Sequence, residues 1–538
     1  MLATARVHFA VPECRKLGML IGMNGANALV ETLTDQGVEV CFANPGTSEM
    51  HFLAALENPR IKAVLCLFEG VATGAADGWA RMRGKPASTL LHLGPGLANG
   101  LANIHNARRA SVPMVNVVGE HSKHHLAFDP PLMSDIEGLA RPLSHWVRTA
   151  AGSGSIAADT AEAVHAAASH PGRISTLILP GDASWGEAGE VKRYPKPERQ
   201  VRAPSPDKVE AAARVLHSGE PTLVILAGNA CTGPALELAG KLKTISGCRI
   251  ATQFFTRRIE RGAGRVTLER IPYSVAPALK FLDGFKHIIT VETGEPVAFF
   301  AYPDQPSLLK PDGCQVHELV ARDEDCLAGL QMLLDAIGGG NAVAALQPLA
   351  DRTTPTGALN PISVAQALCA AMPEHCILVD ESLTTGRESM GYTEGALPHD
   401  TIQNMGGSIG YSPPVATGAS LACMDRRTIC MVGDGSAMYT IQALWTQARE
   451  GLPVTTIIFA NNTYNILKME YSNMKAGPAP GPAALSMIDI DRPTIDWRAM
   501  AKAMGVPSVQ VETAEDFTKA IVASCRAEGP MLIEVKLY

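Results

Sequence analysis

The stretch TICMVGDGSAMYTIQALWTQAREGLPVTTIIFANN, residues 428–462, decides the fold. Residues 428–432 and 454–460 are apolar runs of strand length, and the residues from Ala437 to Glu450 between them have a helical pattern. A strand–helix–strand connection is right-handed and makes its two strands parallel. The stretch therefore predicts a βαβ unit within a parallel α/β sheet.

Polar residues follow both strands of this unit. Asp434 lies in a Gly-Asp-Gly turn after the first strand, and Asn461-Asn462 follow the second. Parallel strands end at one edge of the sheet, where ligands bind. A carboxylate would repel a phosphate held by a glycine turn, whereas Mg²⁺ binds carboxylate, amide and phosphate oxygens together. The stretch predicts a metal–diphosphate clamp, and the alternative is an ordinary turn and loop.

Length and composition narrow the class of protein. A chain of 538 residues is too long for one core and suggests about three domains. The formal charge of −7, with no basic run, argues against nucleic acid as a partner. None of the 12 cysteines occurs as C-x-x-C, no apolar run reaches the ~20 residues of a membrane span, and charged residues interrupt the first 22 residues. We expect a cytoplasmic protein without a membrane span.

Two polar stretches divide the chain. One is rich in charge and proline from Lys192 to Pro206, and the other runs from Gly338 to Pro361. The blocks around them alternate short apolar runs, such as Thr222–Leu226 and His287–Val291, with helical patterns. We predict three doubly wound, parallel-sheet α/β domains at residues 23–190, 207–340 and 361–538, joined by linkers 191–206 and 341–360 and preceded by an extension, residues 1–22.

A glutamate stands at a strand-to-helix junction in the first block. Residues 61–68 are predicted to end a strand, Glu69 follows, and Gly70 to Gly78 is a run of small residues with helical character. A glutamate at a helix N-terminus is favoured by the helix dipole, which is the simpler interpretation. Its apolar surroundings favour a second one, because desolvation raises the pKa of a carboxyl group and suits it to proton transfer.

The Gly-Asp-Gly and Asn-Asn pattern resembles the fingerprint of the thiamin-diphosphate-dependent acetohydroxyacid synthase and benzoylformate decarboxylase superfamily. The resemblance extends from residue 23 to residue 538, includes Asn44-Pro45-Gly46-Thr47, and is greatest to acetolactate synthase large-subunit-like proteins. It implies a pyrimidine-binding, a central and a diphosphate-binding domain, with thiamin diphosphate and Mg²⁺ as cofactors. FAD is implied by family analogy alone, because the central block has no glycine fingerprint.

The resemblance also assigns residues to the cofactor. Glu69 would hydrogen-bond the aminopyrimidine ring, which then removes the thiazolium C2 proton. The predicted metal ligands are Asp434, Asn462 and the carbonyl of Tyr464. The other predicted cofactor contacts are Thr384, Gly407, Ile409, Gly435, Ser436 and Asn465. In the family the cofactor lies between subunits, which implies a homodimer or homotetramer.

The residues around the substrate are less uniform. His92 matches a histidine of benzoylformate decarboxylases, and Glu120 replaces a glutamine that is usual in synthases. Glu120, His121, His124 and His125 are predicted in a loop after a strand at 114–118. Histidines near neutral pH suit proton transfer, and a metal site of the type H-x-x-H-H is the alternative for this loop.

Two further segments bear on the branch of the superfamily. The turn Asp380–Thr385 and the segment Pro493–Trp497 are similar to those of decarboxylases. Arg257-Arg258 stand near the place of a second active-site histidine of benzoylformate decarboxylases. They favour either an anionic substrate group or nucleotide, or a solvated basic face together with Arg261 and Arg265.

These patterns predict an enzyme that decarboxylates a 2-oxo acid and then protonates the acyl carbanion or transfers it to a carbonyl acceptor. The predicted catalytic residues are Glu69, His92, Glu120, His121 and His125. The alternatives are a genuine acetohydroxyacid synthase of branched-chain amino-acid synthesis, a 2-hydroxyacyl-CoA lyase and a cofactor-binding regulatory protein. A nicotinamide dehydrogenase is a distant alternative, because Met438 stands where the third glycine of G-x-G-x-x-G belongs.

Overall fold

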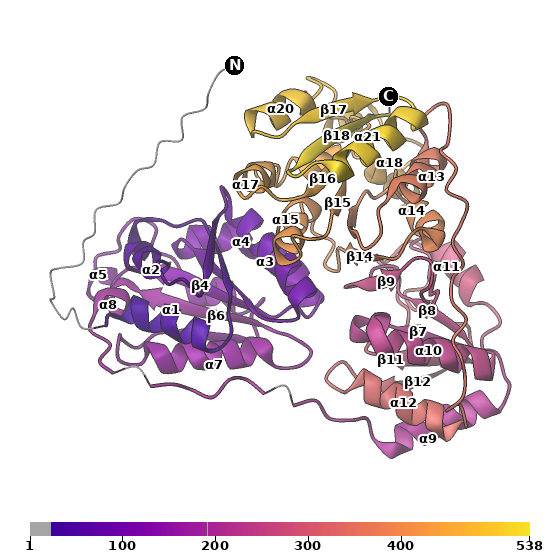
Figure 1. Cartoon of the computed structure of the whole chain (residues 1–538), viewed down its shortest axis with the longest axis horizontal. Coiled ribbons are helices and arrows are strands. Elements are labelled where there is room, and N and C mark those ends of the chain that lie inside the picture. The colour runs from indigo at the N-terminus through magenta and orange to yellow at the C-terminus, as the bar shows by residue number, and fades with distance from the viewer. Residues whose placement is uncertain (1–22, 191, 199, 538) are drawn as a thin grey trace.

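The computed structural model describes residues 23–190, 192–198 and 200–537. These residues form three β-sheets, each flanked by α-helices, which come one after another along the chain (Figure 1). The predicted extension, residues 1–22, lies outside the described residues. The first sheet, in indigo and purple, lies to one side of the second, in magenta, and the third, in orange and yellow. The prediction of a three-domain α/β protein is confirmed. None of the helices in the described ranges is long and apolar enough to cross a membrane.

The first sheet has six parallel strands in the order β2-β1-β3-β4-β6-β5. Its strands are β1 (Val40–Ala43), β2 (Lys62–Leu65), β3 (Ala87–Leu91), β4 (Met114–Glu120), β5 (Trp146–Thr149) and β6 (Ile174–Pro180). Its helices are α1 (Gly25–Asp35), η1 (Thr47–Glu49), α2 (Met50–Ala55), α3 (Glu69–Arg83), α4 (Leu93–Arg109), α5 (Lys123–Leu126), α6 (Ile136–Ala140), α7 (Ile156–Ala168) and α8 (Gly181–Trp185).

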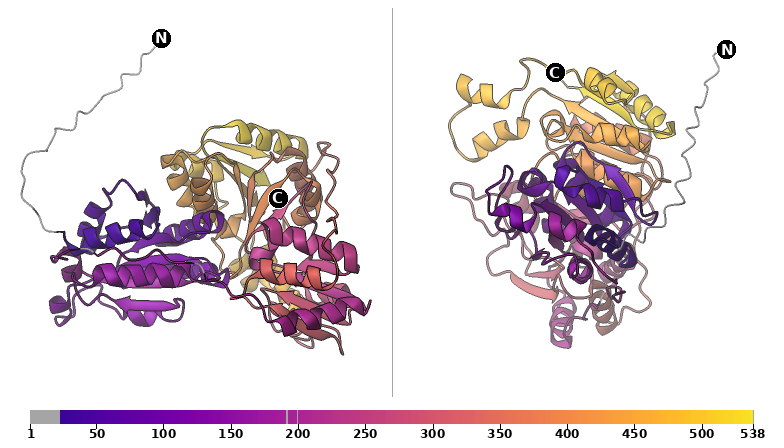
Figure 2. Two further views of the ribbon diagram at one scale, coloured as in Figure 1. Left: turned by 60° about the horizontal axis from the view of Figure 1, so that its bottom comes forward. Right: turned by 90° about the vertical axis from the view of Figure 1, so that its left-hand side faces the viewer.

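Helices cover both faces of this sheet (Figure 2). Phe42 and Leu91 belong to a core cluster with residues of α3 and α4, whereas their neighbours Cys41 and Leu90 belong to a cluster with residues of α1 and α7. Successive strand residues point to opposite faces, so strands buried on both faces must be apolar throughout. Burial of both faces of the sheet therefore explains the continuous apolar runs of the sequence.

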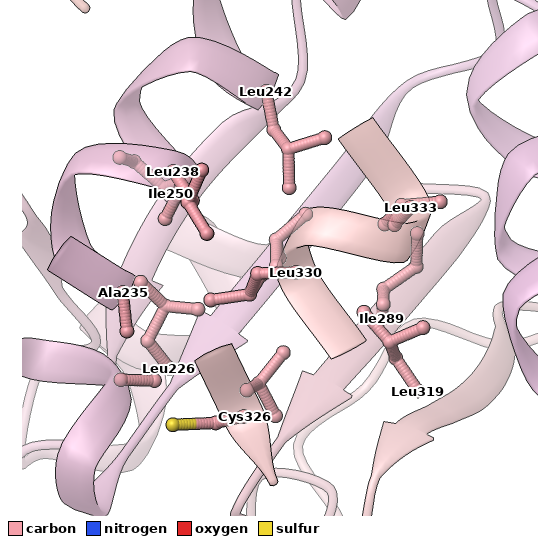
Figure 3. Packing of buried hydrophobic residues seen from close by; sticks show 14 of the residues in the cluster. Leu226, Ala235, Leu238, Leu242, Ile250, Ile289, Leu319, Cys326, Leu330 and Leu333 are labelled. Atoms are coloured by element: carbon pink, nitrogen blue, oxygen red, sulfur yellow. The ribbon is translucent and has the colours of Figure 1, made fainter. Parts of the chain in front are cut away.

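The second sheet has five parallel strands in the order β10-β8-β7-β11-β12. They are β7 (Thr222–Leu226), β8 (Arg249–Thr252), β10 (Glu269–Arg270), β11 (His287–Val291) and β12 (Gln315–Val320). The helices are α9 (Pro206–His217), η2 (Gly228–Cys231), α10 (Gly233–Ser246), α11 (Val275–Leu282) and α12 (Cys326–Ala336). On one face, Leu238 and Leu242 of α10 pack with Leu330 of α12 and Ile289 of β11 (Figure 3).

The third sheet has seven strands in the order β17-β18-β16-β15-β13-β14-β9. They are β9 (Ile259–Arg261), β13 (Ile377–Glu381), β14 (His399–Gln403), β15 (Thr428–Gly433), β16 (Val454–Ala460), β17 (Ser508–Val511) and β18 (Met531–Lys536). The helices are α13 (Pro361–Ala371), α14 (Ser389–Tyr392), η3 (Thr393–Gly395), α15 (Ser412–Ala422), α16 (Asp434–Ala437), α17 (Ala443–Arg449), α18 (Asn465–Asn473), α19 (Pro482–Ile488), α20 (Trp497–Ala503) and α21 (Ala514–Arg526).

One strand departs from the predicted parallel arrangement. β9 comes from the block predicted as the central domain, yet it pairs antiparallel with β14 at the edge of the third sheet. The segment between β8 and β10 therefore reaches out of its own sheet and covers an edge that would otherwise present unpaired backbone groups. The third sheet is mixed because of this one strand.

Two elements of the structure have bounds that differ from those predicted from the sequence. Of the helix predicted from Ala437 to Glu450, only the part from Ala443 to Arg449 is present, as α17. Ala437 instead ends the short helix α16, and the chain turns between the two helices. In that turn Thr440 Oγ1 donates to the Gly410 carbonyl, and Tyr439 lies against Gly410. The strand predicted at residues 61–68 ends at Leu65, and three residues separate it from the start of α3.

The small-residue helix α3 packs against α15 of the third sheet with their backbones in near contact. A Cβ atom at Gly78 would lie 2.0 Å from the Val415 carbonyl oxygen, and one at Gly418 would lie 1.8 Å from that of Ala75. Helices approach this closely only where one of them lacks a side chain. The glycines therefore set how near the first sheet lies to the third.

We expect Gly78→Ala and Gly418→Ala each to lower the free energy of unfolding by roughly 1–3 kcal/mol, because the added methyl group meets backbone that must move. Chemical unfolding followed by circular dichroism measures this. Gly391→Ala in α14 is the matched control, since a Cβ atom there meets nothing within 4 Å. Equal stability of all three variants would show that the two helices are not in close contact.

Candidate active site

Asp434 is the centre of the polar groups at the carboxyl edge of the third sheet. The residue is 2% exposed, and its Oδ2 accepts the backbone N–H groups of Asn461 at 2.9 Å and Asn462 at 2.6 Å. Oδ1 accepts the N–H of Gly435 at 2.8 Å. Burial raises the pKa of Asp434, and these three N–H groups act in the opposite direction. The structure thus brings together the two polar ends of the βαβ unit.

The segment that directly follows β16 forms local turns. Asn462 has a left-handed backbone with φ of 56°, and the Asn461 side chain accepts the N–H of Thr463. The Tyr464 carbonyl accepts the Leu467 N–H, and the Tyr464 ring lies over Gly435, where a Cβ atom would be 2.3 Å from it. Asn465 begins α18 and is exposed, whereas Ser436 is buried in α16. Asn461 and Asn462 therefore lie against Asp434, and the Tyr464 ring lies against its neighbour Gly435.

The loop from Asn404 to Gly410 is the second part of this edge. Asn404 Oδ1 accepts the N–H groups of Gly406 and Gly407, and its Nδ2 donates to the Ser408 carbonyl at 2.7 Å. Gly407 has φ of 79°, a conformation that suits glycine. In the described part of the chain nothing donates a hydrogen bond to the Gly407 carbonyl, and Ile409 is half-buried. Internal hydrogen bonds thus hold the loop, which presents the Gly407 carbonyl as an acceptor.

A buried glutamate supports the end of this loop. Glu381, the last residue of β13, accepts the N–H groups of Tyr411 at 2.9 Å and Ser412 at 2.8 Å through Oε2. Within the described ranges its Oε1 is buried without a hydrogen-bond partner. Burial raises the pKa of Glu381 to about 7. Thr384, in the turn that follows, is half-buried.

Four titratable side chains lie at the carboxyl edge of the first sheet. The sheet order β2-β1-β3-β4 places the segments that follow these strands side by side. Glu69 follows β2, Glu49 follows β1, His92 follows β3, and Glu120 ends β4. Parallel strands bring these residues to one edge although they are far apart in sequence.

Glu69 begins α3 and is 5% exposed. Its Oε2 accepts a hydrogen bond from Asn99 Nδ2 at 3.1 Å, and its Oε1 would lie 3.0 Å from a Cβ atom at Gly96. Asn103, one turn after Asn99 on α4, donates to the Gly70 carbonyl at 2.9 Å and to the Gly410 carbonyl at 3.4 Å. The start of α3 is thereby tied to the loop of the third sheet.

His92 is paired with a carboxylate that the sequence analysis overlooked. His92 Nδ1 lies 2.8 Å from Glu49 Oε2, and Glu49 is 1% exposed. Ser48 and the Gly46 N–H also donate to this carboxylate. Gly119 leaves the space that the carboxylate occupies, since a Cβ atom there would lie 1.7 Å from Glu49 Oε1. The position of Glu49 in the sequence, three residues after the Asn-Pro-Gly turn and close to the end of β1, could have marked it as a candidate site residue.

The residues after β4 divide into a buried and an exposed group. Glu120 is 8% exposed and belongs to the strand, which is longer than predicted because it pairs with β6 as far as Pro180. Burial raises the pKa of Glu120, while the His121 N–H lowers it. His121 contacts the Pro131 carbonyl through Nε2, and His124 and His125 are exposed on α5.

The described residues contain no group of three or more His, Cys, Asp or Glu side chains that could hold a metal ion. The H-x-x-H-H metal site considered for this loop is therefore not supported. Arg258 is bound to Asp400 at 2.6 Å, and Arg261 is buried and donates to the Met390 carbonyl. The solvated basic face predicted for Arg257, Arg258, Arg261 and Arg265 is wrong for Arg261, because β9 carries it into the third sheet.

Comparison with known proteins shows to which family the chain belongs. Residues 23–139 match the N-terminal TPP binding domain of thiamine pyrophosphate enzymes, and residues 389–535 match their C-terminal TPP binding domain. A Mycobacterium tuberculosis protein named "Putative acetolactate synthase large subunit IlvX" is 48% identical over 95% of this chain and 99% of its own length. The chain belongs to the thiamine pyrophosphate enzymes.

Other members of this enzyme family are more distant. Benzoylformate decarboxylase of Pseudomonas aeruginosa is 28% identical, over 95% of this chain and 98% of its own length. The crystal structure of benzoylformate decarboxylase from Polynucleobacter necessarius superposes with a TM-score of 0.82 at 22% identity, over 96% of this chain and 99% of that one. The superfamily and the fold predicted from the sequence are confirmed, and the cofactor class is thiamine pyrophosphate.

Stability should depend on pH through Glu381. The folded protein keeps this group protonated up to about pH 7, whereas the unfolded chain releases the proton near 4.5. Between these values the folded state binds more protons, so the unfolding free energy falls as the pH rises. We expect urea unfolding at pH 5 and pH 8 to show a loss of roughly 1–3 kcal/mol in the wild type relative to Glu381→Gln. Parallel pH curves would contradict this.

Proposed function

We propose that this thiamine pyrophosphate enzyme uses Mg²⁺ and decarboxylates a 2-oxo acid, after which the acyl group is protonated to an aldehyde or joined to a second carbonyl compound. The observation that carries the proposal is the buried Asp434 carboxylate, held by the N–H groups of Asn461 and Asn462 at the carboxyl edge of a parallel sheet. Such an edge is where a cofactor with a diphosphate group is expected.

The donor set around Asp434 fits Mg²⁺. The Asp434 carboxylate, the Asn462 amide and the Tyr464 carbonyl offer oxygen atoms, which this hard cation prefers, and a diphosphate supplies further oxygens. Gly435 and Ser436 begin α16 beside them. The cation would favour the ionised form of Asp434 and offset the effect of burial on its pKa.

The loop from Asn404 to Gly410 would hold the pyrimidine end of the cofactor. The Gly407 carbonyl, which no group in the described ranges occupies, can accept a hydrogen bond from an amino group, and Ile409 offers an apolar surface. When bound, thiamin diphosphate supplies the electron sink for the electron pair that remains when the carboxylate of a 2-oxo acid departs as CO₂.

Glu69 would exchange a proton with the pyrimidine ring. The carboxyl group is buried and receives one hydrogen bond, from Asn99 to Oε2. Its Oε1 lies beside Gly96 of α4, where a Cβ atom would be 3.0 Å from it. A carboxyl group held in this way is oriented for general acid–base catalysis.

The His92–Glu49 pair would deliver a proton to the product. Donation from Nδ1 to the buried Glu49 carboxylate fixes the imidazole and leaves Nε2 to take or give a proton. His92 is the exposed member, with 25% of its side chain accessible. Glu120 lies on the neighbouring strand, and burial raises the pKa of its carboxyl group.

We also propose that a second copy of the chain completes the site. Apolar side chains are exposed beside both sheet edges: Met50, Leu53 and Leu67 beside the first, and Leu383, Met438 and Tyr439 beside the third. Each is between 39% and 54% exposed, which is unusual for large apolar groups next to a polar site. A dimer that joins the first edge of one copy to the third edge of its partner would cover them.

Two substitutions separate cofactor binding from catalysis. We expect Asp434→Ala to abolish Mg²⁺-dependent binding of thiamin diphosphate, because the central metal ligand is lost. Glu69→Gln should keep the binding but lower turnover about 100-fold or more, because a proton-transfer group is lost. Calorimetry with and without Mg²⁺, and CO₂ release from pyruvate, 2-oxobutyrate, benzoylformate and phenylpyruvate, measure the two effects.

Glu57→Gln is the control for Glu69→Gln, because Glu57 is an exposed glutamate outside the site. Binding without any dependence on Mg²⁺ would contradict the metal clamp. Equal turnover of Glu57→Gln and Glu69→Gln would contradict the role of Glu69. Product analysis of the wild type assigns the branch, since an aldehyde marks a decarboxylase and a 2-hydroxyketone or acetohydroxyacid marks a synthase.

A double-mutant cycle tests the His92–Glu49 pair. We expect His92→Ala to lower kcat about 100-fold, and Glu49→Gln to lower it less while shifting its pH profile. The double variant should be no slower than His92→Ala, because Glu49 acts through the imidazole. Steady-state kinetics across pH provide the measurement, and losses that simply multiply would show that the two residues act independently.

A further inference from the structure

Helix α4 carries a cluster of polar side chains that the proposed function does not use. The helix lies on the side of the first sheet that faces the third (Figure 1). Asn103 and Asn106, about one turn apart, are 3% and 0% exposed, and His105 is half-buried. Burying an amide group is costly unless it is hydrogen-bonded, so the partners of these side chains indicate their role.

Asn106 binds both backbone groups of Ser408. Its Nδ2 donates to the Ser408 carbonyl at 2.9 Å, and its Oδ1 accepts the Ser408 N–H at 3.1 Å. Within the described ranges no other group accepts a hydrogen bond from this N–H. The amide thus pairs with Ser408 as one residue of an antiparallel strand pair binds another, and this fixes both the position and the orientation of the segment.

The other contacts of this cluster keep the side chains of α4 in place. Asn106 Nδ2 also donates to Asn103 Oδ1 at 3.0 Å, and Asn103 in turn donates to the Gly410 carbonyl at 3.4 Å. His105 Nε2 lies 3.1 Å from the Gly406 carbonyl, to which it can only donate. Three side chains of one helix therefore bind alternate residues of the loop.

The loop has no room to move toward α4. A Cβ atom at Gly406 would lie 2.4 Å from Asn106 Oδ1 and 2.8 Å from His105 Cδ2. Inside the loop, Asn404 accepts the N–H groups of Gly406 and Gly407. These internal bonds determine the shape of the loop, whereas the contacts with α4 determine where the loop lies.

We propose that Asn106 is a positioning residue for the cofactor. Ser408 stands between Gly407 and Ile409, the two residues of the loop that would meet the pyrimidine end of thiamin diphosphate. By holding both backbone groups of Ser408, Asn106 places these two neighbours for that contact. This role of Asn106 rests on the proposed function, in which the loop holds the pyrimidine end and the edge around Asp434 holds the diphosphate.

Two substitutions of Asn106 change what faces Ser408. Asn106→Ala removes both hydrogen bonds, and we expect the dissociation constant for thiamin diphosphate to rise about tenfold or more. Asn106→Asp has nearly the same shape, but an oxygen replaces the donor that faces the Ser408 carbonyl, and the two acceptors repel one another. This variant should bind the cofactor more weakly still. At saturating cofactor, kcat should change less than the dissociation constant, because the bound cofactor itself orders the loop.

Calorimetry with the full chain and Mg²⁺ compares two ligands, thiamin diphosphate and inorganic diphosphate. The inorganic ion can occupy the edge around Asp434, but it has no pyrimidine end to meet the loop. We therefore expect Asn106→Ala to bind inorganic diphosphate as the wild type does, while it binds thiamin diphosphate more weakly. A residue with a merely structural role would affect both ligands alike.

Asn116→Ala is the matched control, because Asn116 is a fully buried asparagine of the first sheet whose side chain accepts a hydrogen bond from Thr89 of the same sheet. It should bind both ligands as the wild type does, and thermal unfolding checks that each variant is folded. His105→Phe keeps a ring but loses the bond to the Gly406 carbonyl, and it should weaken thiamin diphosphate about fivefold. This milder variant carries the test if Asn106→Ala does not fold.

The outcomes separate this role of Asn106 from the proposed function. Equal binding of thiamin diphosphate by Asn106→Ala and Asn116→Ala would overturn the role and leave the proposed function intact. Equal weakening of both ligands by Asn106→Ala would also overturn it. No Mg²⁺-dependent binding of thiamin diphosphate by the wild type would instead contradict the proposed function, and the role of Asn106 with it.

Discussion

The near contact of helices α3 and α15 is the constraint on which the arrangement of the first and third sheets depends. Gly78 and Gly418 each face a carbonyl oxygen of the opposite helix at a distance that no side chain could share. α3 begins with Glu69, and α15 follows directly on the loop that carries Gly407 and Ile409. Backbone packing at one place thus determines where the first sheet, with Glu69 at its edge, lies relative to the third sheet of the same chain.

The two sheet edges contribute different chemistry. The first presents titratable groups that follow four neighbouring strands, and two of them, Glu69 and Glu49, are almost fully buried. The third presents a carboxylate, an amide and carbonyl groups that suit a cation and a diphosphate. The proposed function assigns proton transfer and cofactor binding to separate sheets. Asn103 and Asn106 of α4 form hydrogen bonds with the loop of the third sheet.

Much of the fold followed from local patterns. The strands at residues 222–226, 287–291 and 454–460 have the predicted bounds, because continuous apolar runs of that length are buried on both faces. The contact of Asp434 with Asn461 and Asn462 could also be anticipated, since these residues lie in one βαβ unit. The predictions failed where a distant element intervened: Gly410 interrupts the helix predicted at 437–450, and β6 extends the strand that ends at Glu120.

The sequence by itself determined the α/β class, the superfamily and the residues at each strand end, because these depend on composition and spacing over a few tens of residues. Only the tertiary structure revealed that Glu49 holds His92, that β9 joins the third sheet, and that Asn106 binds the backbone of Ser408. The residues of each group are separated by many positions in the chain. Their contacts arise from strand order and helix packing, which no local pattern encodes.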